Sequence, residues 1–298
     1  MDSPLRLTVR RIVSVFVSIL ILVFLCSCIQ DKELSDVQEL FVGTDEIIEV
    51  DNSKAKVVVL SGQSNAAGRS KISELSEDDS VKYSEGLSDI MMISENGRTG
   101  NSTETFVCVS TGWGDESSMF GPEVGIAEYL SEVYPGETIY IIKYGYSGAP
   151  IGEFLPGKTC FNALCETMDT GIETLESKGL DPEIVAFCWM QGETDASYDD
   201  MTSNYAGNEQ LLFTSLRQKY GDFLILDAGI SDTWPNYCEV NHIKRDNCFL
   251  LDRCIFINSN KNGVKVSNSD TAHYDAYSMI LLGNLFAQQI TAHISCAF

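Results

Sequence analysis

Positive charge is scarce in this sequence. The chain has 298 residues, with 20 Lys and Arg against 43 Asp and Glu, which gives a formal net charge of -23 at pH 7. Nucleic acid is therefore a poor partner, because binding it requires clustered positive charge. Polyanionic substrates are disfavoured for the same reason, so neutral substrates fit the chain best.

Histidine is scarce too, and no two cysteines have C-x-x-C spacing. The chain has only three histidines, His242, His273 and His293. Because structural zinc sites are built from closely spaced cysteine and histidine ligands, we expect no metal site.

The chain also lacks an apolar run of the roughly 20 residues that a bilayer-spanning helix needs. Its longest run, residues 12–25, follows three arginines and has the pattern of an export signal. The run ends in Leu25-Cys26-Ser27-Cys28, which resembles the bacterial lipoprotein signal with Cys28 as the lipidated residue. An ordinary cleaved signal and an uncleaved anchor are the alternatives. We therefore expect an exported protein that is extracellular, periplasmic or tethered to a membrane.

Three segments are predicted: an export signal (1–28), an acidic linker (29–54) and a single domain (55–298). Outside the signal the chain has an even number of cysteines, eight in all, which permits disulfides in an exported protein. Cys160 with Cys165, and Cys238 with Cys248, are close enough in sequence to form local loops. Cys188 lies in an apolar run, as a free thiol in the core would.

Short apolar runs alternate with helical segments along the domain. Several of the runs are β-branched, as in buried strands of a parallel sheet. The predicted strands are 57–60, 90–93, 138–142, 184–189, 223–226 and 254–257, and the predicted helices are 121–133, 165–178, 204–220 and 276–293. This alternation predicts an α/β fold with helices on both faces of a mainly parallel sheet.

The first predicted strand leads into Gly62-Gln63-Ser64-Asn65. Open α/β sheets place their sites at the carboxyl ends of the strands, and Ser64 lies at such an end. Backbone N–H groups at the start of a helix there would favour developing negative charge. A serine at this position is either a nucleophile or simply the N-cap of the helix.

Near the other end of the domain, Asp270 precedes His273 by three residues. At this spacing the carboxylate can hold one imidazole nitrogen and leave the other free to take a proton from a serine hydroxyl. An Asp-x-x-His pair also occurs at ordinary helix starts, so it gains weight only together with Ser64.

A third polar block, residues 191–195, follows the predicted strand 184–189. The side chain of Gln191 is a candidate donor to an oxyanion. Glu193 and Asp195 are either paired carboxylates for acid–base chemistry or loop residues that bond nearby backbone N–H groups.

Together these blocks resemble the sialate O-acetylesterase and carbohydrate esterase family 6 (acetylxylan esterase-like) group of the SGNH hydrolases. Residues 121–123 and 141–151 resemble that group as well, and the resemblance extends from about residue 56 to residue 289. It implies a three-layer α/β/α sandwich with a flavodoxin-like sheet. It also implies hydrolysis of O-acetyl esters on carbohydrate, such as sialic acid or xylan, through an acetyl-enzyme, without a metal or cofactor.

The resemblance also assigns roles. Ser64 is the nucleophile, His273 the base and Asp270 the orienting acid, and the oxyanion hole consists of the N–H of Ser64, a backbone N–H near Gly148 and the side chain of Gln191. The supporting residues are Gln63, Asn65, Ser147, Glu193 and Asp195.

Two positions depart from the pattern of the group. Ser147-Gly148 replaces its usual Gly-Gly pair, and Met190 replaces a common histidine. The alternatives to an acetylesterase are a glycan-binding lipoprotein with a decayed site and an SGNH esterase or lipase of other acyl specificity.

Overall fold

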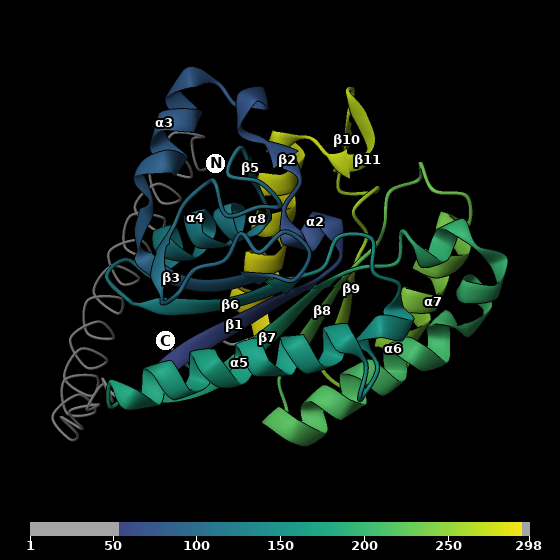
Figure 1. Ribbon diagram of the computed structural model, residues 1–298. Helices are drawn as coiled ribbons and strands as arrows, with labels where there is room; N and C mark the ends of the chain where they lie inside the picture. The colour runs from purple at the N-terminus through teal and green to yellow at the C-terminus, as the bar shows by residue number, and fades with distance from the viewer. Residues whose placement is uncertain (1–53, 294–298) are drawn as a thin grey trace, which may run out of the picture. The chain divides into compact units, whose positions relative to one another are not determined.

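The computed structural model describes residues 54–293 (Figure 1). The predicted export signal, Cys28 and the acidic linker up to residue 53 lie outside the described residues, as does Cys296. The first strand begins at Lys54.

A seven-stranded sheet forms the centre of the domain, with the strand order β4-β3-β6-β1-β7-β8-β9. Neighbouring strands are parallel except at the edge, where β4 is antiparallel to β3. The strands are β1 (Lys54–Gly62), β3 (Leu87–Asn96), β4 (Val107–Val109), β6 (Ile139–Gly145), β7 (Asp181–Met190), β8 (Leu224–Ala228) and β9 (Cys254–Ile257). Because β1 lies between β6 and β7, the segment that follows β1 begins at the carboxyl ends of the strands, in the middle of the sheet.

Helices cover both faces of the sheet, as Figure 1 shows. One face packs against α3 (Glu77–Glu85), α4 (Glu123–Val133) and α8 (Ala276–His293), and the other against α5 (Thr159–Ser177), α6 (Asp199–Tyr220) and α7 (Tyr237–Leu250). Alternate residues of β1 face the two cores: Val58 and Leu60 one, Val57 and Val59 the other. This is the predicted three-layer α/β/α sandwich.

Small elements complete the fold at the strand ends. They are α2 (Ser64–Ala67), the pair β2 (Ser70–Lys71) and β5 (Met119–Phe120), the hairpin β10 (Val266–Ser267) and β11 (Asp270–Tyr274), and three short 3-10 turns, Ile72–Glu74, Ile151–Phe154 and Asp195–Ser197. None of the helices within residues 54–293 is long and apolar enough to cross a membrane.

Each predicted strand and helix corresponds to an observed one, although α5 and α6 begin earlier than predicted. The sequence did not predict α7. The inward side of this helix carries Val240, Lys244, Asn247 and Cys248, which is not the apolar stripe that marks an amphipathic helix.

The two cysteine pairings considered from the sequence are wrong. Cys160 and Cys165 lie on one helix, α5, about 7.5 Å apart along its axis, and Cys238 and Cys248 lie about 15 Å apart along α7. A disulfide requires Cα atoms within about 7 Å. All four are free thiols, and Cys188 is a free thiol buried in β7, as predicted.

Candidate active site

Ser64 begins the short helix α2 at the carboxyl end of β1. The turn before it requires glycine, because Gly62 has φ +144° and a Cβ there would lie 1.9 Å from the carbonyl oxygen of Met190. Gln63 N–H donates to the same oxygen at 3.0 Å and ties the turn to β7. Ser64 is mostly buried at this strand end, with 7% of the residue exposed.

Asp270 and His273 lie on β11 and contact one another. Their Oδ2 and Nδ1 atoms are 2.7 Å apart, and Asp270 Oδ1 accepts from the N–H of Ala272 at 3.1 Å. Burial tends to raise the pKa of Asp270, but the hydrogen bond to His273 and the nearby charge of Arg69 hold it below its usual value. A carboxylate that stays ionised can fix the orientation of the imidazole and leave Nε2 free.

Asn65 joins the serine turn to the hairpin. Its Oδ1 accepts from the N–H of Tyr274 at 3.3 Å, and its Nδ2 donates to Glu193 Oε1 at 2.7 Å. Since Asn65 follows Ser64 and Tyr274 follows His273, these bonds bring the serine and the histidine to the same edge of the sheet. Among the described residues, the Ser64 hydroxyl and the His273 ring make no hydrogen bond with each other. Catalytic hydrogen bonds are often long until a substrate binds.

Gln191 is not placed as the sequence predicted. Its side chain is fully buried, and Nε2 donates to Asp195 Oδ2 at 2.6 Å and to Gln63 Oε1 at 3.2 Å. Its Oε1 accepts from the hydroxyl of Tyr205 at 3.0 Å. An amide has two hydrogens, and both of these are used inside the protein. We therefore correct the oxyanion assignment: the side chain of Gln191 holds loops together.

Glu193 and Asp195 are also buried, with 2% exposure each, and bond to different partners. Asp195 Oδ2 accepts from the N–H of Ile151 at 2.9 Å as well as from Gln191. Glu193 Oε1 accepts from Asn65, while Glu193 Oε2 has no hydrogen-bond partner. Burial raises the pKa of both carboxyls despite these bonds. Both residues therefore fix the loop after β7, in keeping with the loop interpretation and not with a carboxylate pair.

The turn after β6 carries Ser147 and Gly148. Gly148 has φ +82°, and its carbonyl oxygen accepts from the hydroxyl of Thr194 at 3.2 Å. Ser147 donates its hydroxyl to Asp115 Oδ2 at 2.5 Å, and its carbonyl accepts from Arg98 Nη1 at 2.8 Å. These bonds fix the turn, which lies beside the serine and keeps a glycine at position 148.

Asp115 belongs to none of the motifs recognised in the sequence, yet it is central to the site. It is 2% exposed and accepts from Asn96 Nδ2 at 2.8 Å, in addition to Ser147. Its Oδ2 also lies 3.1 Å from Arg69 Nη1. Arg69, whose charge also acts on Asp270, is thus anchored by a buried acid.

A buried ionic cluster lies behind the loop after β7, and it too was missed. Lys244 Nζ lies 2.6 Å from Asp227 Oδ1 and 3.3 Å from Glu209 Oε1, and all three side chains are fully buried. The same ammonium donates to the carbonyl of Gln191 at 2.9 Å. The cluster therefore supports the backbone from which Gln191 and Glu193 project.

The other two histidines lie elsewhere. His242 is on α7, with Nδ1 4.0 Å from Cys238 Sγ, and His293, the last residue of α8, faces the carbonyl of Gln289 at 3.0 Å. Among the described residues, no group of His, Cys, Asp and Glu side chains is arranged to hold a metal ion.

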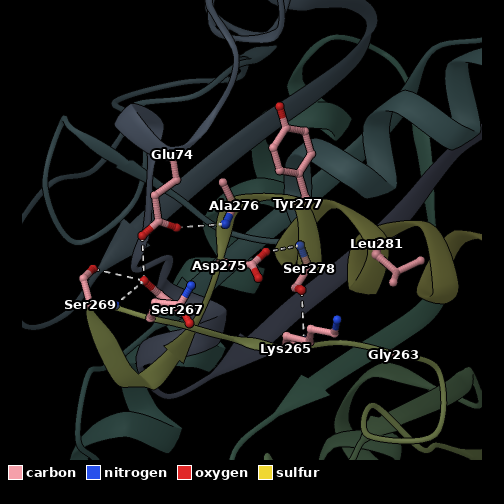
Figure 2. A pocket seen from close by; sticks show the side chains of 11 residues that line it. Glu74, Gly263, Lys265, Ser267, Ser269, Asp275, Ala276, Tyr277, Ser278 and Leu281 are labelled. Atoms are coloured by element: carbon pink, nitrogen blue, oxygen red, sulfur yellow. Dashed lines mark hydrogen bonds between the residues drawn. The ribbon is translucent and has the colours of Figure 1, made fainter.

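A pocket of about 620 Å³ lies at the base of the hairpin (Figure 2). Glu74 accepts from the hydroxyl of Ser267 at 2.6 Å and from the N–H of Ala276 at 3.2 Å, and so ties the hairpin to the start of α8. Neither Ser64 nor His273 lines this pocket, so it is separate from the candidate active site.

The family model described as "carbohydrate esterase, sialic acid-specific acetylesterase" matches residues 54–292 of this chain. No curated protein matches it. Among solved structures, a protein from Arabidopsis thaliana has a TM-score of 0.62 at 17% identity, over 80% of this chain and 99% of that one.

Two further solved structures are similar. NanS has a TM-score of 0.60 at 12% identity, over 80% of this chain and 97% of that one. A carbohydrate acetylesterase from Xanthomonas citri has a TM-score of 0.53 at 12% identity, over 80% of this chain and 56% of that one. At these identities the likeness shows the fold, which is the SGNH hydrolase fold predicted from the sequence.

Proposed function

The chain belongs to the sialic acid-specific acetylesterase family of carbohydrate esterases, and we propose that it removes O-acetyl groups from carbohydrate with Ser64 as the nucleophile. Membership confirms the predicted family and makes the chain a carboxylic ester hydrolase. The observation that supports the role of Ser64 is the contact between Asn65 and Tyr274, which places the serine turn beside the Asp270–His273 pair.

In the first half of the proposed reaction, Ser64 Oγ attacks the acetyl carbonyl carbon while His273 Nε2 accepts the hydroxyl proton. The C–O bond to the sugar then breaks, and His273 returns the proton to the departing sugar oxygen. Asp270 keeps the imidazole in the required tautomer and stabilises the imidazolium. In the second half, His273 accepts a proton from water, which attacks the acetyl carbon of the acetyl-enzyme. The bond from that carbon to Ser64 Oγ then breaks, His273 returns the proton to Ser64 Oγ, and acetate is released.

The negative charge that develops on the carbonyl oxygen requires donors. We assign them to the backbone N–H groups of Ser64 and Gly148, since the side chain of Gln191 has no hydrogen to spare. Gln63 lies beside Ser64, and its Oε1 accepts from the N–H of Thr194 at 3.3 Å. This bond holds the loop after β7 against the serine turn.

The decisive experiment measures acetate release from acetylated xylan and from O-acetylated sialic acid. We expect Ser64→Ala to lower kcat by about 10⁴-fold or more, as loss of a triad member does elsewhere. Ser61→Ala is the matched control, because Ser61 lies three residues earlier near the end of β1, is fully buried and has a hydroxyl without a hydrogen-bond partner. It should keep wild-type turnover.

Wild-type-like turnover in Ser64→Ala would refute the assignment of the nucleophile. If the wild-type protein releases acetate from neither carbohydrate nor from an aryl acetate, and fails to react with a fluorophosphonate probe, the chain is a glycan-binding protein instead. If butyryl esters react as fast as acetyl esters, the acyl specificity differs from the one proposed.

We also propose that the protein is exported and that Cys28 tethers it to a membrane. The basic and apolar pattern of residues 1–28 supports this, and an acidic linker would then separate the anchor from the domain. Metabolic labelling with a fatty acid tests the tether, with Cys28→Ala as the comparison. Loss of label together with release from the membrane is the expected result, and equal labelling of both proteins would refute it.

A further inference from the structure

Two cysteines that no sequence argument paired lie in contact. The Sγ atoms of Cys248 and Cys254 are 2.8 Å apart, well inside the roughly 3.5–4.0 Å at which non-bonded heavy atoms pack. Cys248 lies in the last turn of α7, and Cys254 is the first residue of β9. A disulfide has an S–S distance of about 2.05 Å, so the two sulfurs need to move together by less than about 1 Å.

Hydrogen bonds fix the backbone of Arg253, the residue between the two cysteines that directly precedes β9. Arg253 has φ +49° and is the one non-glycine residue with a positive φ among the described residues. Its carbonyl accepts from the N–H of Ile225 at 2.8 Å and from Arg217 Nη2 at 3.0 Å. These hydrogen bonds hold Arg253 in its left-handed conformation and so fix the position of Cys254 at the start of β9. The approach of the two sulfurs is therefore a consequence of how α7 joins the sheet.

The other described cysteines have no such neighbour. Cys108 Sγ lies 3.9 Å from Met91 Sδ, and Cys238 Sγ lies 4.0 Å from a ring nitrogen of His242. Cys188 is fully buried in β7, and Cys160 and Cys165 are too far apart on α5. Within residues 54–293 the geometry thus selects a single pair.

We propose that Cys248 and Cys254 form a structural disulfide when the protein meets a disulfide oxidant, either a small-molecule disulfide or a thiol–disulfide oxidoreductase. Cys254 is the more accessible of the two, while Cys248 is only 8% exposed. The Cys254 thiolate attacks the oxidant R–S–S–R and expels one thiolate. Cys248 then attacks Cys254 Sγ and expels the second. Two protein thiols are oxidised to one disulfide, and R–S–S–R is reduced to two R–SH after proton uptake.

The chemistry of the reduced pair agrees with this order of events. Contact with Cys254, burial and the nearby Asp227 raise the pKa of Cys248, so the more accessible Cys254 is the thiol that reacts first with the oxidant. Disulfides form and persist in oxidising compartments, which is where an exported protein resides.

The disulfide would join α7 to β9 beside the buried ionic cluster. Cys248 Sγ lies 4.0 Å from Asp227 Oδ2, and Asp227 is the carboxyl group nearest to Lys244. Among the described residues, the recorded polar contacts of the two thiols are with each other and with Asp227, and they include neither Ser64 nor His273. We therefore expect the disulfide to affect stability and not turnover, which makes this inference independent of the proposed esterase mechanism.

Peptide mapping of the full chain tests the proposal directly. The protein is incubated with glutathione disulfide, free thiols are blocked with N-ethylmaleimide, and the unreduced protein is digested with trypsin. Cleavage after Arg253 separates the two cysteines into peptides 246–253 and 254–261. The expected product is these two peptides joined by a disulfide. Recovery of both as alkylated peptides, or their joining to other cysteines, would overturn the proposal.

Thermal unfolding supplies a second readout. A disulfide that closes so short a loop should raise the Tm by roughly 5 °C. A reductant should remove this gain from the wild-type protein and from the control Cys238→Ser, whose cysteine is exposed at the other end of α7. Cys254→Ser should show the lower Tm with or without reductant. An equal response of Cys254→Ser and wild type to the reductant would contradict the stabilising role.

Discussion

Lys244→Met should be among the most destabilising substitutions in this protein. Lys244 is fully buried, and its ammonium lies 2.6 Å from Asp227 and 3.3 Å from Glu209. Burial lowers the pKa of Lys244, but the two carboxylates raise it by more, so the lysine stays charged at neutral pH. Methionine has nearly the same length and keeps the packing, so the substitution removes chiefly the charge and its hydrogen bonds.

The expected loss in the free energy of unfolding is about 3–5 kcal/mol, because removing one partner leaves a buried charge uncompensated. The carbonyl of Gln191 and the hydroxyl of Tyr205 lose a donor as well. For a domain of this size, this loss corresponds to a fall in Tm of roughly 10 °C. Activity should also fall, since the ammonium supports the loop that carries Gln191 and Glu193.

Chemical denaturation at pH 7 measures the loss, with Lys219→Met as the control. Lys219 lies 2.7 Å from Asp169, but both side chains are more than 40% exposed, so the control should lose less than about 1 kcal/mol. Asp227 has a pKa well above its usual value, because burial and Glu209 disfavour its charge more than Lys244 favours it.

The defect of Lys244→Met should therefore shrink as the pH falls toward 5. A carboxyl group whose pKa is raised in the folded state favours folding when it is protonated, and it loses that advantage as the pH rises through the raised value. A loss below 1 kcal/mol at pH 7, or a defect that grows as the pH falls, would refute the reasoning.

The remaining predictions concern the carboxylates near the serine. Asp270→Asn should lower kcat on an aryl acetate by about 10³–10⁴-fold with little change in KM, because an amide leaves His273 in the wrong tautomer; less than a tenfold loss would argue against the orienting role. Glu193→Gln replaces a buried carboxyl group, whose charge burial opposes, by a neutral amide that still accepts from Asn65. The free energy of unfolding of the variant should therefore rise relative to that of the wild type as the pH rises from 5 to 8. Denaturation across that range checks the trend, and a larger loss of activity than in Asp270→Asn would mean that the acid has been misassigned.

The strands could be predicted from the sequence because they are buried on both faces. The buried stretch of a parallel strand covered by helices is a continuous apolar run, as in the runs that became β1, β7 and β8. The pairing of Asp270 with His273 was predictable for a similar reason. A separation of three residues allows the two side chains to meet when the chain turns between them, and here the N–H of Ala272 donates to Asp270 Oδ1 while His273 Nδ1 lies against Oδ2.

The site roles that could not be predicted correctly depend on hydrogen-bond partners distant in sequence. Gln191 looked like an oxyanion donor because it ends a strand, but its hydrogens go to Gln63, 128 residues away, and to Asp195. Nothing local in the sequence distinguishes an amide that faces a substrate from one that holds two loops. The same is true of Asp115, whose partners Arg69, Asn96 and Ser147 come from three separate segments.

The sequence by itself determined the α/β architecture, the family and the residues with the chemistry of an esterase, because apolar periodicity and short motifs are local properties of the chain. Only the tertiary structure decided which polar groups are already satisfied in the interior, which cation lies against Asp227, and which two cysteines meet. These depend on the packing of α7 against the sheet, and α7 is the helix whose buried face is polar enough to escape prediction.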